Sequence, residues 1–205
     1  MTSPAAYHGW IALAPCRWEP DTRSLRRLER LPDGRGGADG TRHVGPGLGV
    51  LCGHTADAGR GRAGARGLRW MLKLDEDLAP FYAWPRRSTR GIWRTVHDGR
   101  GRLLRSPTLW EDVVKTICTT NITWTQTKGM VQRWWMRWAR VAGRPRSAFP
   151  TPAQVLDGGE AIFAETVRMG LSCAYVLQKG TCWEVVSGAR DLEALRGRPI
   201  YRLRP

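Results

Sequence analysis

The chain has 205 residues, of which 41% are hydrophobic, so it is long enough to bury the core of one large or two small domains. Lys and Arg number 33 against 18 Asp and Glu, which gives a formal net charge of +15. The longest apolar runs, Ile11 to Pro15 and Tyr175 to Leu177, are too short to cross a bilayer. The N-terminus also lacks the basic-then-apolar order of a secretion signal. These features argue against a membrane protein.

The positive charge makes nucleic acid the first partner to consider. A composition rich in Arg and Gly can also reflect a GC-rich genome, so the total charge leaves both interpretations open. Residues 1–105 carry 19 basic and 10 acidic side chains, and residues 106–205 carry 14 and 8. The excess is therefore spread over both halves, and the sequence has no single basic tail.

Neither the cysteines nor the histidines have the spacing of a metal site. The cysteines show no CxxC or CxxH pattern and no disulfide framework: Cys16, Cys52, Cys118, Cys173 and Cys182. The histidines are scattered along the chain: His8, His43, His54 and His97. We therefore expect free thiols, no metal and no cofactor.

The first third of the chain predicts a small domain that contains β-structure. The segments YHGWIALAPCRWEP and SLRRLERLPDG have the pattern of short strands, with Asp33-Gly34 as a hairpin turn. From Gly34 to Gly67 the sequence has no helical or strand period and is rich in glycine. Because glycine loses much backbone entropy on folding, this segment predicts a loop or disorder.

An amphipathic pattern follows the Gly-rich segment, with Leu68, Met71, Leu72 and Leu78 as its apolar positions. The acidic run Asp75-Glu76-Asp77 can cap a short helix after it. The stretches PRRSTRG and DGRGR then predict a domain boundary. We expect an α+β protein, with a β-containing domain over residues 1–84 and a mostly helical domain over 85–205.

The helical half begins at Ser106-Pro107, which predicts an N-cap and a first turn. The spacing then predicts an apolar stripe that faces a core: Leu109, Val113 and Ile117, with Trp110 and Val114 beside them. The charged residues of this helix, Glu111, Asp112 and Lys115, are expected to face outward or to flank the stripe. The helix should end at the polar corner Thr119-Thr120-Asn121.

Two further helix starts have the pattern of a capping box. Thr123 with Gln126 begins the second helix, and Thr151-Pro152 with Gln154 begins a third. The second helix carries Trp134, Trp135 and Trp138. Aromatic side chains near basic residues can stack on bases, but the spacing of these three favours core packing.

The corner that ends in Asn121 has two interpretations. Thr and Asn are common at helix ends because their side chains satisfy backbone groups. Alternatively, free N–H groups and short polar side chains at helix ends can hold a phosphate or reach a base edge. Lys128, one turn later, supports the second interpretation.

In order and spacing, several segments together resemble the helix-hairpin-helix DNA glycosylases, in particular the 8-oxoguanine and 3-methyladenine glycosylase-like branch. The resemblance covers residues 70–195 and rests on SPTLWEDVVKTICTTN, TKGMV, FPTPAQVL, MGLSCAYVL and VVSGARDLEAL. It implies excision of damaged purines from double-stranded DNA, and a location in the cytoplasm with the nucleoid. In this family the Asn of the corner enters the minor groove, and Asn121 is the matching position. The DNA-binding set that we expect is Thr120, Asn121, Gln126 and Lys128.

The resemblance does not extend to the catalytic groups of the family. A Leu-Pro-Gly-x-Gly type hairpin and a catalytic Asp are expected about where this sequence reads RGRPIYRLRP, and neither is present. We therefore carry over no catalytic residue and expect this chain to be inactive alone. If helices have lost their packing partners, then Leu109, Val113, Trp134 and Trp138 should be partly exposed. A non-catalytic DNA-binding protein and an unstable fragment of a disrupted reading frame remain as alternatives.

Overall fold

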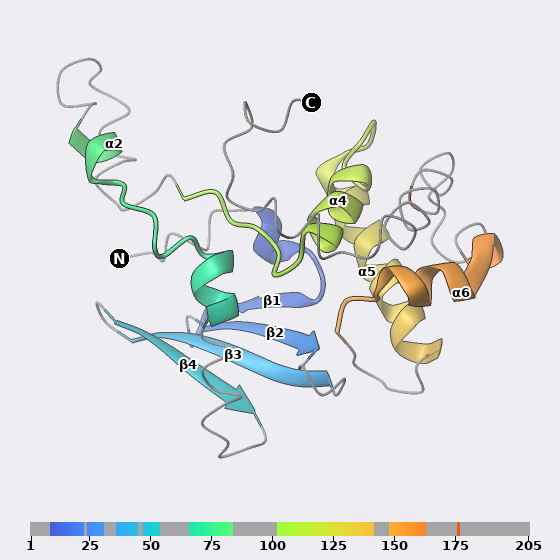
Figure 1. Ribbon diagram of the computed structural model, residues 1–205, viewed down its shortest axis with the longest axis horizontal. Helices are drawn as coiled ribbons and strands as arrows, with labels where there is room; N and C mark the ends of the chain where they lie inside the picture. The colour runs from blue at the N-terminus through green and yellow to red at the C-terminus, as the bar shows by residue number, and fades with distance from the viewer. Residues whose placement is uncertain are drawn as a thin grey trace. The chain divides into compact units, whose positions relative to one another are not determined.

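The computed structural model describes residues 9–22, 24–30, 36–44, 47–53, 66–83, 102–141, 148–162 and 176. The chain divides into two compact units, Met1–Pro107 and Thr108–Pro205. It contains both strands and helices, which confirms a mixed α+β class (Figure 1). Within the described residues, no helix is long and apolar enough to cross a membrane.

The first unit contains a four-stranded antiparallel sheet in the order β1-β2-β3-β4 (Figure 1). Its strands are β1 (Cys16–Glu19), β2 (Ser24–Arg30), β3 (Gly36–Val44) and β4 (Gly47–Gly53). β1 and β2 confirm the predicted short strands at CRWE and SLRRLER, whereas Gly9–Ala12 of the first predicted strand segment is a 3-10 helix. Cys16 lies opposite Arg27 in the register of β1 and β2. β2 pairs with β3 so that Arg30 lies opposite Gly36. The predicted Asp33-Gly34 turn falls between these two residues, outside the described part of the chain.

The prediction of loop or disorder from Gly34 to Gly67 is wrong where this segment forms β3 and β4. β4 pairs along its whole length with residues 38–44 of β3, from Ala38 opposite Gly53 to Val44 opposite Gly47. Such pairing uses backbone N–H and C=O groups, which glycine supplies as well as any other residue. β3 (GGADGTRHV) carries no apolar alternation, and the only alternation in β4, at Leu48, Val50 and Cys52, is short and lies among glycines, so composition outweighed pattern in the prediction.

The core of the first unit lies between the sheet and short helical segments. Ile11, from η2 (Gly9–Ala12), packs with Leu25 of β2 and with Leu72. Leu68 and Met71 are also buried, which confirms the amphipathic pattern around them. They belong to a helical turn over residues 66–71.

Helix α2 (Ala79–Ala83) has the predicted acidic cap. The backbone N–H of Ala79 donates to Asp77 Oδ1 at 2.9 Å. A carboxylate at this position satisfies one of the N–H groups that the first turn of a helix leaves without a partner.

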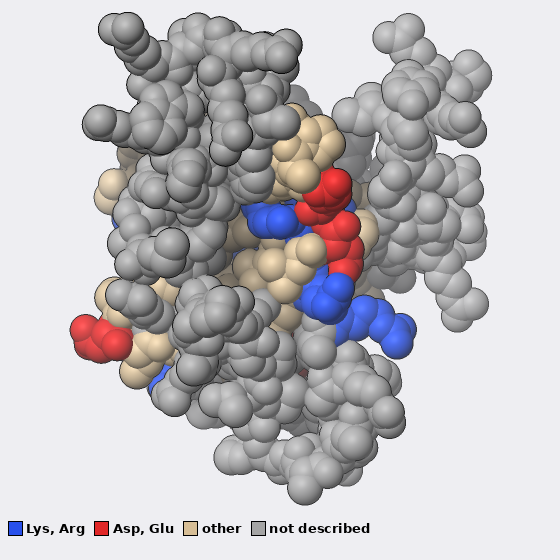
Figure 2. Space-filling model, turned by 90° about the vertical axis from the view of Figure 1, so that its left-hand side faces the viewer, with Lys and Arg blue, Asp and Glu red and all other residues tan. Residues whose placement is uncertain are grey.

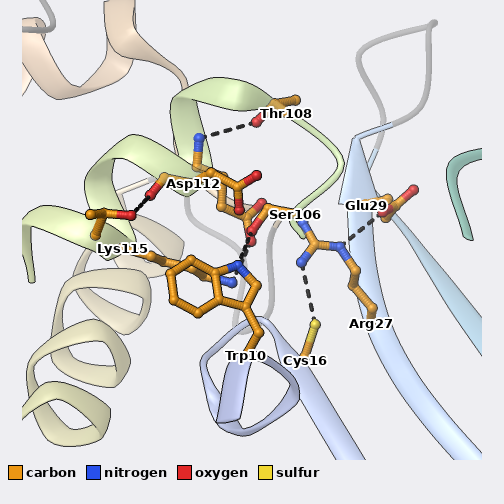
Figure 3. Close-up of polar contacts among 10 residues, drawn as sticks. Trp10, Cys16, Arg27, Glu29, Ser106, Thr108, Asp112 and Lys115 are labelled. Atoms are coloured by element: carbon orange, nitrogen blue, oxygen red, sulfur yellow. Dashed lines mark hydrogen bonds and ion pairs between the residues drawn. The ribbon is translucent and has the colours of Figure 1, made fainter. Parts of the chain in front are cut away.

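Residues 102–106 are attached to the first unit by side chains and backbone. The indole N–H of Trp10 donates to Ser106 Oγ at 3.1 Å (Figure 3). The Arg105 guanidinium lies 3.9 Å from the centre of the Trp70 ring, and its backbone N–H donates to Met71 O at 3.1 Å. The predicted boundary at residue 84 adjoins residues 84–101, which the structure does not describe, so it stays a prediction.

The second unit contains α4 (Leu109–Ile117), α5 (Trp124–Val141) and α6 (Pro152–Ile162). The N-cap of α4 is Thr108, which accepts a hydrogen bond from the Glu111 N–H at 3.2 Å, and not Ser106 as predicted (Figure 3). A cap residue was available on either side of Pro107. Ser106 is buried and accepts from Trp10, so Thr108 is the residue left to begin the helix.

The face that α4 buries differs from the predicted one. Trp110, Val114 and Cys118 are buried, whereas Leu109, Val113 and Ile117 are only half-buried. Two residues expected outside, Glu111 and Lys115, are each 1% exposed. They pair with each other, and this pairing lets a helix face that includes two charges enter the core.

Helices α5 and α6 close the core of the second unit. Val131, Trp134 and Trp138 are buried, so the prediction of core packing is confirmed for these two tryptophans, while Trp135 is half-buried. The expectation that Trp134 and Trp138 are partly exposed is therefore wrong. The Trp134 and Phe149 rings meet edge to face at 4.7 Å between centroids. The resembling segments MGLSCAYVL and VVSGARDLEAL lie outside the described residues except for Val176.

Candidate nucleic-acid interface

The corner between α4 and α5 begins with two threonines that close the end of α4. The Thr119 hydroxyl donates to Thr116 O and the Thr120 hydroxyl donates to Ile117 O, both at 2.7 Å. The same carbonyls also accept from the backbone N–H groups of Thr119 and Thr120, at 3.0 and 3.2 Å, so each threonine closes the end of α4 with two hydrogen bonds. Thr120, which is exposed, therefore has a structural role in addition to the predicted DNA contact.

Asn121 reverses the chain after α4. Its φ of 57° lies in the left-handed region, where Asn is tolerated better than other residues with a Cβ. Its side chain is exposed and has no hydrogen-bond or ion-pair partner among the described residues. The backbone therefore presents a short amide side chain to solvent at the tip of the corner.

The start of α5 is fixed by the predicted capping box. The Thr123 N–H donates to Gln126 Oε1 at 2.9 Å, and the Gln126 N–H donates to Thr123 Oγ1 at 3.3 Å. The side-chain carbonyl of Gln126 is thus used by the cap, and its amide NH₂ group is the part left for another contact. The same reciprocal pair, Thr151 with Gln154, begins α6 as predicted.

A buried hydrogen bond fastens the two helices on either side of the corner. Thr127, 1% exposed, donates from its hydroxyl to Cys118 O at 3.2 Å. This bond joins the first turn of α5 to the end of α4. The turn that contains Asn121 is therefore held by the hydrogen bonds of Thr120 before it and Thr123 after it. The buried bond from Thr127 to Cys118 O holds the two helices together next to the turn.

The structure brings the four predicted DNA-binding residues to one corner. Thr120 and Asn121 lie in the turn, and Gln126 and Lys128 lie in the first two turns of α5. Lys128 is exposed and forms no ion pair with a described residue. Contact of these residues with DNA stays a prediction.

The sequence around the corner is rich in basic residues and contains few acidic ones. Residues 113–156 contain no Asp or Glu, and they contain seven basic residues: Lys115, Lys128, Arg133, Arg137, Arg140, Arg144 and Arg146. In the first unit, by contrast, Arg17 pairs with Glu19 and Lys73 with Glu76. The face displayed in Figure 2 likewise shows acidic side chains beside basic ones. The corner and α5 therefore differ from the first unit in having no internal counter-charge.

Sequence analysis did not single out Trp124, which is 40% exposed at the first position of α5. Among the tryptophans that the structure describes, it alone is in the exposed class. The signal in the sequence was its place directly after the cap residue Thr123. A helical wheel puts Trp124 on the same side of α5 as the buried residues Thr127, Val131 and Trp134, so its exposure reflects its place at the first position of the helix and not a solvent-facing side of it.

The acidic groups near the corner have other roles. Glu111 is buried against Lys115, and their charged atoms are 2.6 Å apart.

Cys118 is a free thiol, as is Cys16. Burial raises the pKa of Cys118 to about 12, although the nearby Lys115 charge acts to lower it. No group of His, Cys, Asp and Glu in the described ranges could hold a metal ion.

Comparisons with known proteins give a likeness in structure. No family model matches the chain, and no curated protein sequence matches it. The structure of MBOgg1 in complex with a low-affinity DNA ligand superimposes with a TM-score of 0.62 and 16% identity, over 84% of this chain and 55% of that one. The 3-methyladenine DNA glycosylase from Archaeoglobus fulgidus superimposes with a TM-score of 0.63 and 19% identity, over 81% of this chain and 57% of that one.

A third similar structure is the Clostridium acetobutylicum 8-oxoguanine glycosylase/lyase in complex with double-stranded DNA that has cytosine opposite 8-oxoguanine. It superimposes with a TM-score of 0.54 and 14% identity, over 86% of this chain and 67% of that one. This chain therefore shares the fold of these three structures over the part that superimposes. This chain spans a little more than half the length of the first two structures, at 55% and 57%.

Proposed function

We propose that this chain binds double-stranded DNA and prefers duplexes in which a base pair is damaged or mismatched. The observation that carries the proposal is the exposed, left-handed Asn121 at a rigid corner, followed by Lys128 and a helix without acidic residues. The likeness in fold to three DNA glycosylases, two of them in complex with DNA, supports it. Positive charge supplies attraction to any duplex, and the corner supplies the preference.

The proposed contact uses the minor groove. A base that leaves the stack costs a few kcal/mol of unstacking, and the cost is smallest where pairing is already weak. A short amide side chain in the vacated space offsets part of that cost by a hydrogen bond to the base left behind. Asn121 has the size and polarity for this role, and its left-handed backbone makes it the outermost point of the turn.

Recognition of damaged or mismatched pairs would serve base-excision repair. We infer that this chain alone does not release bases. Glycosidic-bond hydrolysis needs a carboxylate or an amine that can reach the sugar. Glu111 forms a buried ion pair with Lys115. Asp75 is exposed and forms an ion pair with Arg69. Asp77 is exposed and caps α2 by accepting from the Ala79 N–H. A base-release assay tests this inference, because a chain that is catalytic alone would release the damaged base.

The experiment measures binding of the purified full chain to three duplexes that differ at one position: matched, mismatched and abasic. We expect tighter binding to the mismatched and abasic duplexes by about 1–3 kcal/mol, the scale of one base contact. Equal affinity for all three duplexes would contradict the proposal. Incubation with duplexes that carry 8-oxoguanine or 3-methyladenine should give no base release above a protein-free control.

A further inference from the structure

Trp124 lies in an unusual environment for a tryptophan. It is 40% exposed, and its ring has no aromatic, cation–π or hydrogen-bond partner among the described residues. Trp10, Trp70 and Trp110 show the usual arrangement, because each has a defined partner in Ser106, Arg105 and Pro150 respectively. An indole in solvent loses the burial that normally stabilises it, so its position raises the question of a ligand.

The neighbours of Trp124 define what such a ligand must be. Lys128 is four residues later, so its side chain lies on the same face of α5, about 5–6 Å away at Cβ. Asn121 precedes Trp124 by three residues, and the exposed hydroxyls of Thr123 and Thr125 flank it. A flat aromatic surface beside a cation and short polar groups is complementary to a nucleobase with its phosphate.

Charge complementarity favours a nucleic acid over an apolar protein segment. Helix α5 contains four basic residues, Lys128, Arg133, Arg137 and Arg140, and no acidic one. The exposed apolar area is also small and discontinuous, because Met136, the next large exposed hydrophobic residue of the helix, lies three turns further on. A single aromatic ring in a basic, polar surface is the arrangement that holds unpaired nucleotides.

We propose that Trp124 stacks on an unpaired nucleobase of bound DNA, while Lys128 contacts the adjacent phosphate. The inference rests on the proposed DNA binding and adds a substrate class to it: DNA with unpaired nucleotides, as in a gap, a bulge or a single strand. Asn121 distinguishes damaged from intact pairs within a duplex. Trp124 recognises bases that are already outside the stack.

The test compares binding of wild type, W124A, W124F and M136A to a matched duplex and to the same duplex with a three-nucleotide single-stranded gap. Loss of one base–aromatic stack weakens binding by about 5- to 150-fold. We expect this loss for W124A on the gapped duplex, at most a threefold effect on the matched duplex, and a smaller loss for W124F. M136A removes an equally exposed hydrophobic residue of the same helix and should bind both substrates like wild type.

The outcomes separate this inference from the proposed function. If wild type binds DNA and W124A binds the gapped duplex as tightly as M136A does, the stacking inference is overturned and the proposed function stands. An equal loss on matched and gapped duplexes would also overturn it, because Trp124 would then act without regard to unpaired bases. If wild type binds no DNA, both fail. Thermal melts of the four proteins confirm that each variant is folded.

Discussion

Glu111 Oε1 and Lys115 Nζ lie 2.6 Å apart in α4, and each side chain is 1% exposed. The two charges are one helical turn apart, so the helix itself brings them together. Lys115 Nζ has no second acceptor among the described residues, and it lies 5.7 Å from the centroid of the Phe149 ring. Its charge therefore depends on Glu111, with a weaker contribution from the aromatic face.

This dependence predicts a strong effect of removing one partner. Lys115→Met should lower the free energy of unfolding by about 3–5 kcal/mol, because it breaks a buried ion pair by removing one of its two members. The double variant Glu111→Leu with Lys115→Met should lose less than Lys115→Met alone. Denaturant unfolding of the three proteins measures both differences. A single variant as stable as wild type would show that the pair is not buried in solution.

The Cys118 thiol predicts a pH dependence of stability. Desolvation by burial raises its pKa from 9.0 to about 12, although the nearby Lys115 charge lowers it. Between these pH values the unfolded thiol has lost its proton while the folded thiol keeps it. The stabilising contribution is therefore complete below pH 9 and is lost as the pH rises toward 12.

The measurement compares unfolding of wild type and Cys118→Ala from pH 8 to pH 11. The difference in free energy between them should shrink at higher pH, by at most about 1.4 kcal/mol per pH unit. A difference that does not change with pH would show that the thiol titrates alike in both states. In the folded protein at pH 8.5, mass spectrometry should find the Cys118 peptide alkylated more slowly than in denaturant.

The capping box at the start of α5 predicts a change in stability that spares recognition. Thr123→Ala removes the hydroxyl that accepts from the Gln126 N–H and should cost about 0.5–2 kcal/mol. Thr123→Ser keeps an oxygen at this position and is the matched control. Both variants should retain the wild-type preference for mismatched over matched DNA, which calorimetry together with binding titrations can establish.

Lys128 predicts an effect on the salt dependence of binding. Lys128→Gln should weaken binding to matched and mismatched duplexes equally and reduce the slope of log K against log salt by about 0.9. Arg17→Gln changes the net charge by the same amount, but Arg17 is already paired with Glu19 in the first unit. Titrations at several salt concentrations should show the smaller slope for Lys128→Gln only. A change of equal size in Arg17→Gln would assign the effect to net charge.

The parts of the fold that sequence patterns predict well are those set by local hydrogen bonds. The Thr123–Gln126 and Thr151–Gln154 boxes depend on residues three positions apart, and both occur as predicted. Patterns of neighbouring residues fail as predictors where contacts between residues far apart in the sequence determine the structure. Ser106 is an acceptable cap by itself, but Trp10, far away in the sequence, uses its hydroxyl.

The buried face of α4 shows a second kind of failure. A periodicity argument assigns charged residues to solvent, and an i, i+4 pair of opposite charge can enter the core because each charge neutralises the other. The pattern alone does not distinguish an exposed pair from a buried one. The corner residues were predictable as a cluster because they lie close together in the sequence. The exposure of Trp124 was not, because periodicity places it with the buried residues of α5 and only the end of the helix leaves it uncovered.

The central claim is that the Asn121 side chain discriminates damaged from intact duplexes. The left-handed backbone of Asn121 determines which substitution is the best test of this claim. Alanine at a φ of 57° introduces strain of about 1–2 kcal/mol, so Asn121→Ala mixes a stability effect with any loss of contact. Glycine adopts this conformation freely, so Asn121→Gly removes the side chain and leaves the corner intact.

The most direct measurement is therefore the ratio of affinities for mismatched and matched duplexes, for wild type and Asn121→Gly, beside their thermal melts. We predict that Asn121→Gly melts like wild type, keeps its affinity for matched DNA, and loses about 1–3 kcal/mol of preference for the mismatched duplex. A stable Asn121→Gly protein that retains the full wild-type preference would contradict the account.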